Sequence, residues 1–112
     1  MSTAPSPVFH YEIEKSTDDL NNAVTTVKCS GRIVSETAGQ LKEAVKPLIP
    51  AGGRILIDLT DVQHVDSSGL GALVGLKVSA VNAGYCRLEL VNLTPRVADL
   101  LRLTKLTQLF AA

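Results

Sequence analysis

The residues best suited to chemistry lie together near the middle of the chain, where residues 66–69 combine one carboxylate, two hydroxyls and a glycine (DSSG). Residues 54–59 before them are rich in Ile and Leu, which is typical of a strand buried on both faces. From Leu70 onward the apolar residues recur at three- and four-residue steps, which predicts a helix. Residues 62–68 are therefore predicted to form a polar hinge between a strand and the N-terminus of a helix.

Such a hinge offers the chemistry of a helix N-terminus. An oxygen of Asp66, Ser67 or Ser68 is expected to cap the helix, leaving amide donors and the positive end of the helix dipole facing solvent. In an α/β sheet, ligands and partners bind at the carboxyl ends of the strands, where this hinge is predicted to lie. The plainer alternative is a structural cap with no further role.

The start of this helix is unusually rich in glycine. Gly69, Gly71 and Gly75 each reduce helix stability by roughly 1 kcal/mol relative to alanine in an exposed interior, so we expect a close backbone approach onto the protein's own sheet or onto a partner. Leu70 is expected to project near the helix entrance instead of into the sheet, which would give a protein-docking surface. The residues predicted to contact a partner are Asp66, Ser68, Gly69, Leu70 and Leu73.

The sequence does not favour an enzyme. A nucleophilic serine needs a base within hydrogen-bond reach. His64 lies near the hinge in the sequence, but it belongs to no motif that would place it beside a serine of the hinge. The chain has no Gly-x-Ser-x-Gly elbow and no glycine-rich phosphate loop with a lysine. His10 and His64 are isolated from the Cys and carboxylate clusters that hold metals, so no metal or cofactor is expected. A ligand-binding domain using the helix N-terminus as an anion or nucleotide site is a further alternative.

A chain of 112 residues is predicted to form one domain. Residues 1–7 (MSTAPSP) are a polar leader expected to be flexible, and residues 8–112 form the domain. Two strands joined by a polar turn at 15–22 favour a hairpin, and the later crossovers favour a mixed α/β sheet. The predicted elements are strands 8–14, 23–33, 54–59 and 85–91, a helix from an N-cap at Ser35 to residue 49, a helix from Leu70 to Gly84, a helix starting at Thr94-Pro95, and a short strand or packed tail at 106–110.

Composition excludes several classes of partner. The formal net charge is zero and the charges are interspersed, so there is no electrostatic footprint for nucleic acid or an anionic membrane. No apolar run is long enough to span a bilayer and no signal-peptide pattern appears, so a cytoplasmic protein is expected. Cys29 and Cys86 fall in predicted strands without metal-ligand spacing, which favours buried free thiols.

The hinge also carries a resemblance to a known family. The segment DSSGLG at 66–71, preceded by ILIDLTDVQHV and followed by LVNLTPRVADLLRLTKL, resembles the bacterial anti-sigma factor antagonists. These are single-domain members of the STAS fold, which is shared with the cytoplasmic domains of sulphate transporters. The resemblance covers residues 24–110. It implies one STAS-type domain with a mixed β-sheet and helices packed mainly on one face, and we expect a monomer or a weak dimer.

What the resemblance implies for function is a phosphorylation switch. In this family the first hydroxyl residue after the Asp, which corresponds to Ser67, is phosphorylated by the cognate anti-sigma factor, an ATP-dependent serine kinase. A metal-dependent serine phosphatase removes the phosphate. The unphosphorylated antagonist binds the anti-sigma factor and frees the sigma factor, whereas the phosphorylated form releases it. The protein would thus control transcription without touching DNA.

The chain departs from the family pattern after its second strand. The family usually carries a Gly-Glu-Leu-Asp-like segment there, with the last acid near the phosphorylated hydroxyl, whereas this chain has Gly31-Arg32-Ile33-Val34. Val34 replaces that carboxylate and Arg32 replaces another acid, which bears on partner choice and on phosphorylation. Arg32 is expected either to be solvated or to stabilise a nearby phosphate. The alternative function is a non-switching STAS scaffold or oligomerisation module.

Overall fold

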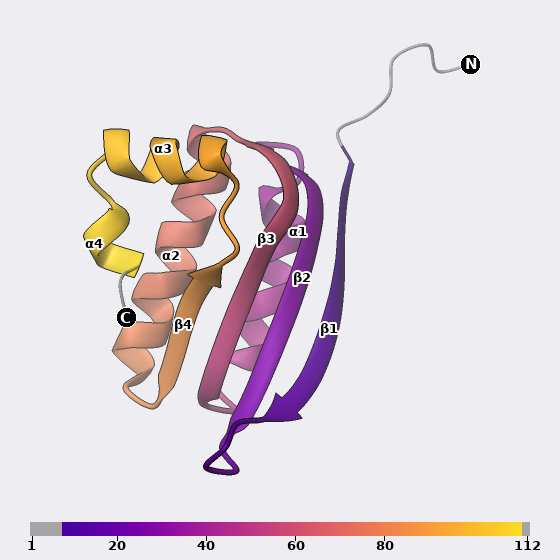
Figure 1. Ribbon diagram of the computed structural model, residues 1–112, viewed down its shortest axis with the longest axis vertical. Coiled ribbons are helices and arrows are strands. Elements are labelled where there is room, and N and C mark those ends of the chain that lie inside the picture. The colour runs from indigo at the N-terminus through magenta and orange to yellow at the C-terminus, as the bar shows by residue number, and fades with distance from the viewer. Residues whose placement is uncertain (1–7, 111–112) are drawn as a thin grey trace.

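The computed structural model describes residues 8–110, so the predicted leader at residues 1–7 lies outside the described residues. Within this range the chain forms one four-stranded mixed sheet in the order β1-β2-β3-β4, with helices between and after the strands (Figure 1). Strand β1 is antiparallel to β2, and β2, β3 and β4 are parallel, which confirms the predicted α/β mixed sheet. The elements are β1 (Phe9–Thr17), β2 (Ala23–Ile33), α1 (Ala38–Val45), the 3-10 helix η1 (Lys46–Leu48), β3 (Gly53–Val65), α2 (Ser67–Ala83), β4 (Cys86–Val91), α3 (Pro95–Leu103) and α4 (Thr107–Phe110).

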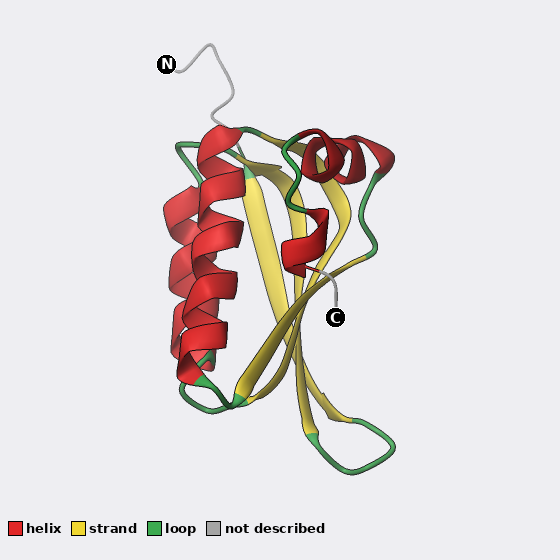
Figure 2. Cartoon of the chain, turned by 90° about the vertical axis from the view of Figure 1, so that its left-hand side faces the viewer, coloured by secondary structure: helices red, strands yellow, loops and turns green. Residues whose placement is uncertain are grey.

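The predicted packing of the helices mainly on one face holds for the crossover helices α1 and α2, which lie side by side there, whereas α3 and α4 lie on the other side (Figure 2). The alternation of β3 explains this layering, because Ile55, Ile57 and Leu59 are at most 1% exposed while the residues between them are half-buried. Apolar side chains from both helices complete the core above them. The two predicted free thiols, Cys29 and Cys86, are confirmed as buried. Burial raises the pKa of the Cys29 thiol to about 12, so it stays protonated at neutral pH.

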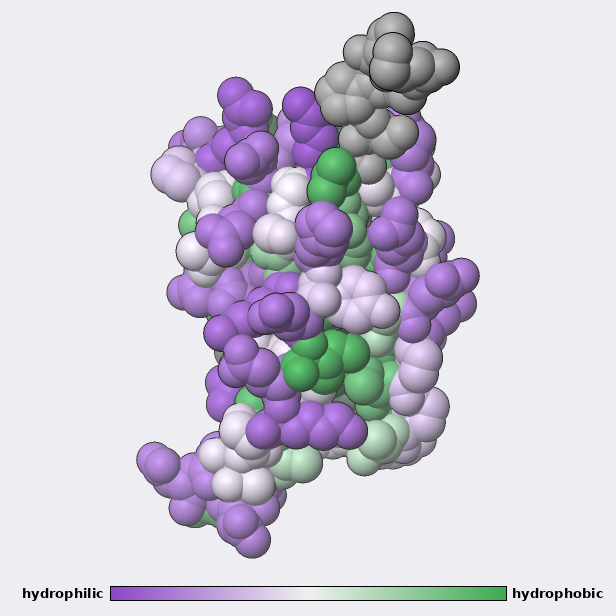
Figure 3. Space-filling model, turned by 90° about the vertical axis from the view of Figure 1, so that its right-hand side faces the viewer, coloured by the Kyte–Doolittle hydropathy of each residue, from purple (hydrophilic) through white to green (hydrophobic). Residues whose placement is uncertain are grey.

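Strand β1 is an exposed edge, as its alternating sequence predicts, and it extends beyond residue 14 to Thr17. Its side of the molecule is largely hydrophilic, with small apolar areas (Figure 3). The exposed apolar side chains Tyr11 and Ile13 alternate with the acids Glu12 and Glu14. Charged residues on an edge strand oppose pairing with another chain, so β1 is protected against edge-to-edge association.

Several predicted boundaries are confirmed. Strand β2 has the predicted limits, Gly84 ends α2 in the left-handed conformation (φ 81°), and Thr94 caps α3 by accepting from the Val97 amide at 3.3 Å. Strand β3 is longer than predicted because pairing with β2 continues to Val65, although the apolar run ends at Leu59. None of the helices in residues 8–110 is long and apolar enough to cross a membrane.

One prediction is wrong, and one pair of alternatives is decided. Ser35 is not an N-cap, because its hydroxyl donates to Glu36 Oε1 at 2.7 Å and α1 begins only at Ala38. The residues before α1 instead form a turn in which the Thr37 hydroxyl bonds to the backbone. The C-terminal segment is the short helix α4, not a strand, and the packed-tail alternative is confirmed because Phe110 is only 8% exposed.

Candidate functional site

The predicted hinge is organised by the side chain of Asp66. Its Oδ1 accepts a hydrogen bond from the Gly69 amide at 2.9 Å, which makes Asp66 the N-cap among the three candidates. Its Oδ2 accepts from the Ser35 amide at 3.3 Å, and its own amide donates to the Ile33 carbonyl at 3.3 Å. One residue therefore fixes the entrance of α2 and joins it to the segment that follows β2.

The two serines that follow lie on the surface. Ser67 and Ser68 are both exposed, and neither hydroxyl has a hydrogen-bond partner among residues 8–110. Their amides likewise have no partner in the described part of the chain, because the first bonds of the cap come from Gly69 and Leu70. The site thus presents free hydroxyls beside unsatisfied amide donors at the positive end of a 17-residue helix.

Gly69 explains how α2 approaches the sheet so closely. A Cβ at this position would lie 1.9 Å from the Ile33 carbonyl oxygen and 2.7 Å from its carbonyl carbon. The predicted close backbone approach is confirmed here, and it is made onto the protein's own β2. Gly71 and Gly75 differ, because a Cβ at either position would meet nothing within 4 Å beyond the adjacent residues and the backbone of α2 itself. These two glycines face open space on the outer surface of α2.

The prediction that the apolar residues of this helix form a docking surface is wrong. Gly69 and Leu70 are buried, Leu70 being 9% exposed, and Leu73 is 0% exposed within the main core. The reason is the Gly69 contact, which draws the first turns of α2 onto the end of β2 and directs these side chains into the sheet. The exposed surface of α2 is formed instead by Ser67, Ser68, Gly71, Gly75, Val78, Val81 and Asn82.

Val34, which replaces the carboxylate expected from the resemblance, is buried at 8% exposure. Its amide donates to Thr37 Oγ1 at 2.9 Å, and the Thr37 hydroxyl donates to the Arg32 carbonyl at 2.7 Å. Arg32 is exposed and its neighbour in register on β3 is His64. The segment beside the hinge is therefore held by an internal threonine network. The sequence analysis missed Thr37. The signal that could have indicated it is its position directly before the first apolar residue of α1.

His64 and the hinge serines do not form a nucleophile–base pair in the described part of the chain. His64 is exposed and has no hydrogen bond to Ser67 or to any other described side chain. Among residues 8–110, no group of three or more His, Cys, Asp or Glu side chains is placed to hold a metal ion. What the site offers is a modifiable hydroxyl at a helix N-terminus, with its position fixed by the Asp66 cap.

These features define the class of small α/β domains whose central strand leads into a capped, hydroxyl-bearing helix N-terminus. The chain matches the STAS domain over residues 7–111, and it belongs to that family. The anti-sigma-B factor antagonist of Bacillus subtilis is 36% identical over 99 residues, which cover 88% of this chain and 84% of that protein. The sequence resemblance to this group of proteins is thereby confirmed.

Solved structures show the same fold. An anti-sigma factor antagonist from Mycobacterium paratuberculosis superposes with a TM-score of 0.77 at 24% identity, covering 92% of this chain and 83% of that one. The anti-sigma factor antagonist SpoIIAA in its unphosphorylated form gives a TM-score of 0.69 at 20% identity, covering 88% and 84%. Its phosphorylated form, from Bacillus, gives 0.66 at 18% identity, covering 88% and 86%.

Proposed function

We propose that this protein is an anti-sigma factor antagonist whose binding to its anti-sigma factor is switched off by phosphorylation of Ser67. The observation that carries the proposal is the exposed Ser67 hydroxyl at the N-terminus of α2, free of hydrogen bonds within residues 8–110. The kinase would be the anti-sigma factor itself, and a serine phosphatase would restore the binding form. The protein would act in the cytoplasm and would touch neither DNA nor membrane.

Relatives support the regulatory role. The Bacillus subtilis protein, whose name states that it antagonises the anti-sigma-B factor, aligns over most of both chains. SpoIIAA shares the fold and has been solved both with and without phosphate, so this fold can exist in both forms. The hinge of the present chain keeps the Asp-Ser-Ser-Gly sequence in which the resemblance places the phosphorylated residue.

The electrostatics of the hinge make a phosphate tolerable to the fold. A phosphoserine carries about −1.5 to −2 charges at pH 7. At Ser67 this charge would face the unsatisfied Ser67 and Ser68 amides and the positive end of α2, which favour an anion. The same charge beside Asp66 would repel an acidic partner and would be desolvated in a protein interface. Binding would therefore weaken without a conformational change.

The surface offered to the partner differs from the one predicted from sequence. Asp66 and Ser68 remain part of this surface, because Ser68 is exposed and Asp66 is only half-buried. Gly69, Leu70 and Leu73 are buried between α2 and the sheet, where they fix the position of α2 and do not contact the partner. The exposed face beyond the serines carries Gly71, Gly75 and Val78, and it is free of charged side chains. We infer that the kinase domain of the partner rests on this uncharged face when its catalytic site reaches Ser67.

The direct test is phosphorylation by a candidate partner. The protein is incubated with ATP and each serine-kinase anti-sigma factor of the organism, and the modified residue is mapped by mass spectrometry. We expect phosphate on Ser67 in the wild type and in Ser68→Ala, and none in Ser67→Ala. Ser67→Ala should bind the partner constitutively and Ser67→Asp should bind weakly. Equal affinities of these two variants would remove the switch and leave the fold assignment intact.

A second function is favoured by one observation. Val34 stands buried where the family usually has a carboxylate near the phosphorylated hydroxyl. A STAS domain without that acid would serve as a non-switching scaffold or oligomerisation module. Sedimentation analysis distinguishes the two functions, because a scaffold would associate equally well before and after treatment with kinase. Val34→Asp should raise the rate of phosphorylation if the lost carboxylate is what limits it.

A further inference from the structure

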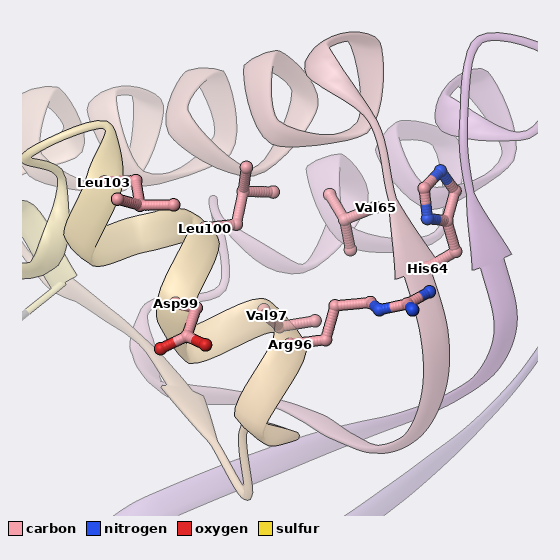
Figure 4. Close-up of a pocket in the computed structure, with 7 residues that line it drawn as sticks. All are labelled: His64, Val65, Arg96, Val97, Asp99, Leu100 and Leu103. Atoms are coloured by element: carbon pink, nitrogen blue, oxygen red, sulfur yellow. The ribbon is translucent and has the colours of Figure 1, made fainter.

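A pocket of about 430 Å³ lies between the end of β3 and α3, directly before the hinge (Figure 4). His64 and Val65 line it, and Asp66 follows them in the chain, so this pocket belongs to the surroundings of the modification site. The other end of the sheet is separate from the hinge. Strand β3 runs from Gly53 to Val65, which corresponds to about 40 Å at about 3.3 Å per residue.

Three connections meet at this far end, which lies at the bottom of the sheet in Figure 1. They are the β1–β2 turn, the connection from η1 to β3 and the connection from α2 to β4. The Gly53 amide donates to the Tyr85 carbonyl at 3.1 Å, and a Cβ on Gly52 would lie 3.0 Å from the Tyr85 ring. The ring of Tyr85 therefore packs against the glycine turn that precedes β3. A pocket of about 210 Å³ lies between these connections, and Asp18 and Arg87 line it together with Tyr85.

Exposed apolar side chains gather at the same end. Leu20, Val81 and Tyr85 are 81%, 60% and 61% exposed, which places them among the most exposed large apolar side chains of the described residues. Leu20 lies on a turn of fixed shape, because Asp18 Oδ1 accepts hydrogen bonds from the Leu20 and Asn22 amides, each at 2.9 Å. A rigid turn that holds a leucine in water is ordered in advance for binding, because little conformational freedom is lost when a partner covers it.

The pocket also carries a guanidinium without an ion-pair partner. Arg54 and Arg87 lie opposite each other in the β3–β4 register, and like charges in that arrangement are destabilising. Arg54 is neutralised by both carboxylate oxygens of Glu89, at 2.9 and 3.2 Å, whereas Arg87 forms no ion pair within residues 8–110. The carboxylate of Asp18, which lines the pocket, is engaged by the amides of the turn. An acidic ligand at Arg87 would therefore relieve a repulsion between the two strands.

We propose that this end of the sheet is a docking site for another protein, which binds through a segment that places a carboxylate beside a large apolar side chain. The carboxylate would pair with Arg87, and the apolar side chain would cover Tyr85 and Leu20. Arginine and tyrosine are enriched among the residues that anchor protein interfaces, and an arginine–carboxylate pair can be bidentate. Exposed Leu20 and Val81 extend the apolar surface beyond the pocket, which suits a protein better than an enclosed small molecule.

Distance separates this docking site from the hinge. Charged groups are screened beyond about 8 Å at physiological ionic strength, and the two ends of β3 are about 40 Å apart. A phosphate on Ser67 therefore leaves the electrostatics at Arg87 unchanged. The docked protein would stay bound in both states of Ser67, so it could hold the domain in place while the hinge end gains and loses its own partner. The docking site does not rest on the proposed function, because it uses no residue of the hinge.

Peptides test the chemistry of the docking site directly. A random 12-residue library displayed on phage is selected on the wild-type protein and counter-selected on Arg87→Glu. Enriched peptides should pair Asp or Glu with a large apolar residue, and they should shift the amide resonances of residues 18–23, 52–54 and 81–87. Replacing the acid of an enriched peptide by its amide should weaken binding by at least about tenfold. No enrichment, equal binding of the amide form or shifts elsewhere would overturn the proposal.

Matched variants test the location of the docking site and its independence from Ser67. Leu20→Asp takes no part in the selection, and it should weaken binding of an enriched peptide by at least about tenfold. Arg96→Glu and Leu103→Asp make the two kinds of change at the hinge end, where Leu103 is 76% exposed, and both should bind as the wild type does. Ser67→Asp should also keep the wild-type affinity. Unchanged binding by Leu20→Asp would refute the docking site, and weaker binding by Ser67→Asp would refute its independence.

Sedimentation of the protein without peptide distinguishes another protein from a second copy of this chain. We expect the wild type and Arg87→Glu to sediment alike, because the site is assigned to a different partner. A wild-type dimer that dissociates in Arg87→Glu would show that a second copy occupies the site, and the proposed partner would then be wrong.

Discussion

Gly69 is the residue on which the geometry of the hinge depends most directly. We expect Gly69→Ala to destabilise the domain by about 1–3 kcal/mol or more, because the new Cβ would overlap the Ile33 carbonyl oxygen at 1.9 Å and the backbone has to move. The free energy of unfolding is measured by urea denaturation. Gly71→Ala is the matched control, since its Cβ meets open space and should stabilise the helix by up to about 1 kcal/mol. Equal effects of the two variants would contradict the packing argument.

Thr37 is a second residue that we expect to contribute strongly to the stability of the domain, although the sequence does not single it out. It is 1% exposed, and its hydroxyl satisfies both the Val34 amide and the Arg32 carbonyl. Thr37→Val keeps the shape but leaves these groups unpaired, so we expect a loss of about 1–3 kcal/mol of stability. Thr37→Ser keeps the hydroxyl and should lose less. A stability of Thr37→Val equal to that of Thr37→Ser would show that the hydrogen bonds contribute little.

The pairing of the parallel strands carries an ion pair with a defined pH dependence. Arg54 Nε and Nη2 on β3 lie 2.9 and 3.2 Å from the two carboxylate oxygens of Glu89 on β4. This hydrogen-bonded pairing lowers the pKa of Glu89. The pair therefore contributes stability that is fully present above the pKa of Glu89 in the unfolded chain and is lost as the pH falls through its lower folded value.

We expect Arg54→Met to be less stable than the wild type at neutral pH, and the difference to shrink as the solution is acidified below about pH 4. Thermal denaturation at a series of pH values measures it. Lys28→Met is the control, because the Lys28–Glu14 pair is more exposed, with side chains 49% and 56% accessible. A difference between Arg54→Met and the wild type that is constant from pH 3 to pH 7 would exclude this linkage.

The elements themselves were predictable where local chemistry decides them. The β2 limits, the Gly84 end of α2 and the Thr94 cap depend on residues within one turn of each boundary, and all three were predicted. The start of α1 was not, because the Thr37 network competes with capping by Ser35. The length of β3 was not predicted, because its backbone pairing with β2 continues to Val65, beyond the end of the apolar run at Leu59.

At the scale of the whole molecule, the sequence indicated the hinge but not which of its residues reach solvent. The periodicity of apolar residues predicts the mixed sheet and the helix that begins at the two serines. The DSSGLG segment indicates the family. The burial of Leu70 and Leu73 depends on how far α2 moves toward β2, which is set by Gly69 and Ile33, 36 residues apart in the numbering. Contacts at such separations leave no periodic signal in the sequence.

The domain as a whole should accept negative charge at Ser67 without rearrangement. We expect the free energy of unfolding of Ser67→Asp to lie within about 0.5 kcal/mol of the wild-type value. The interaction of the new charge with the helix dipole, worth about 0.3–1 kcal/mol, offsets its repulsion from Asp66. Asn82→Asp places the same charge in the exposed last turn of α2, at the negative end of the dipole, and should be destabilising. Thermal denaturation compares the two variants.

The amide spectrum of the phosphorylated protein then separates a local electrostatic switch from a conformational one. Because the Asp66 cap and the Gly69 contact hold the entrance of α2 against β2, resonance changes should be confined to residues 64–71 and to the neighbouring segment 32–37. Changes spread over β4 and α3 would show that phosphate moves the helices. In that case charge alone would not explain release of the partner, and the position of α2 on the sheet would be the switched element.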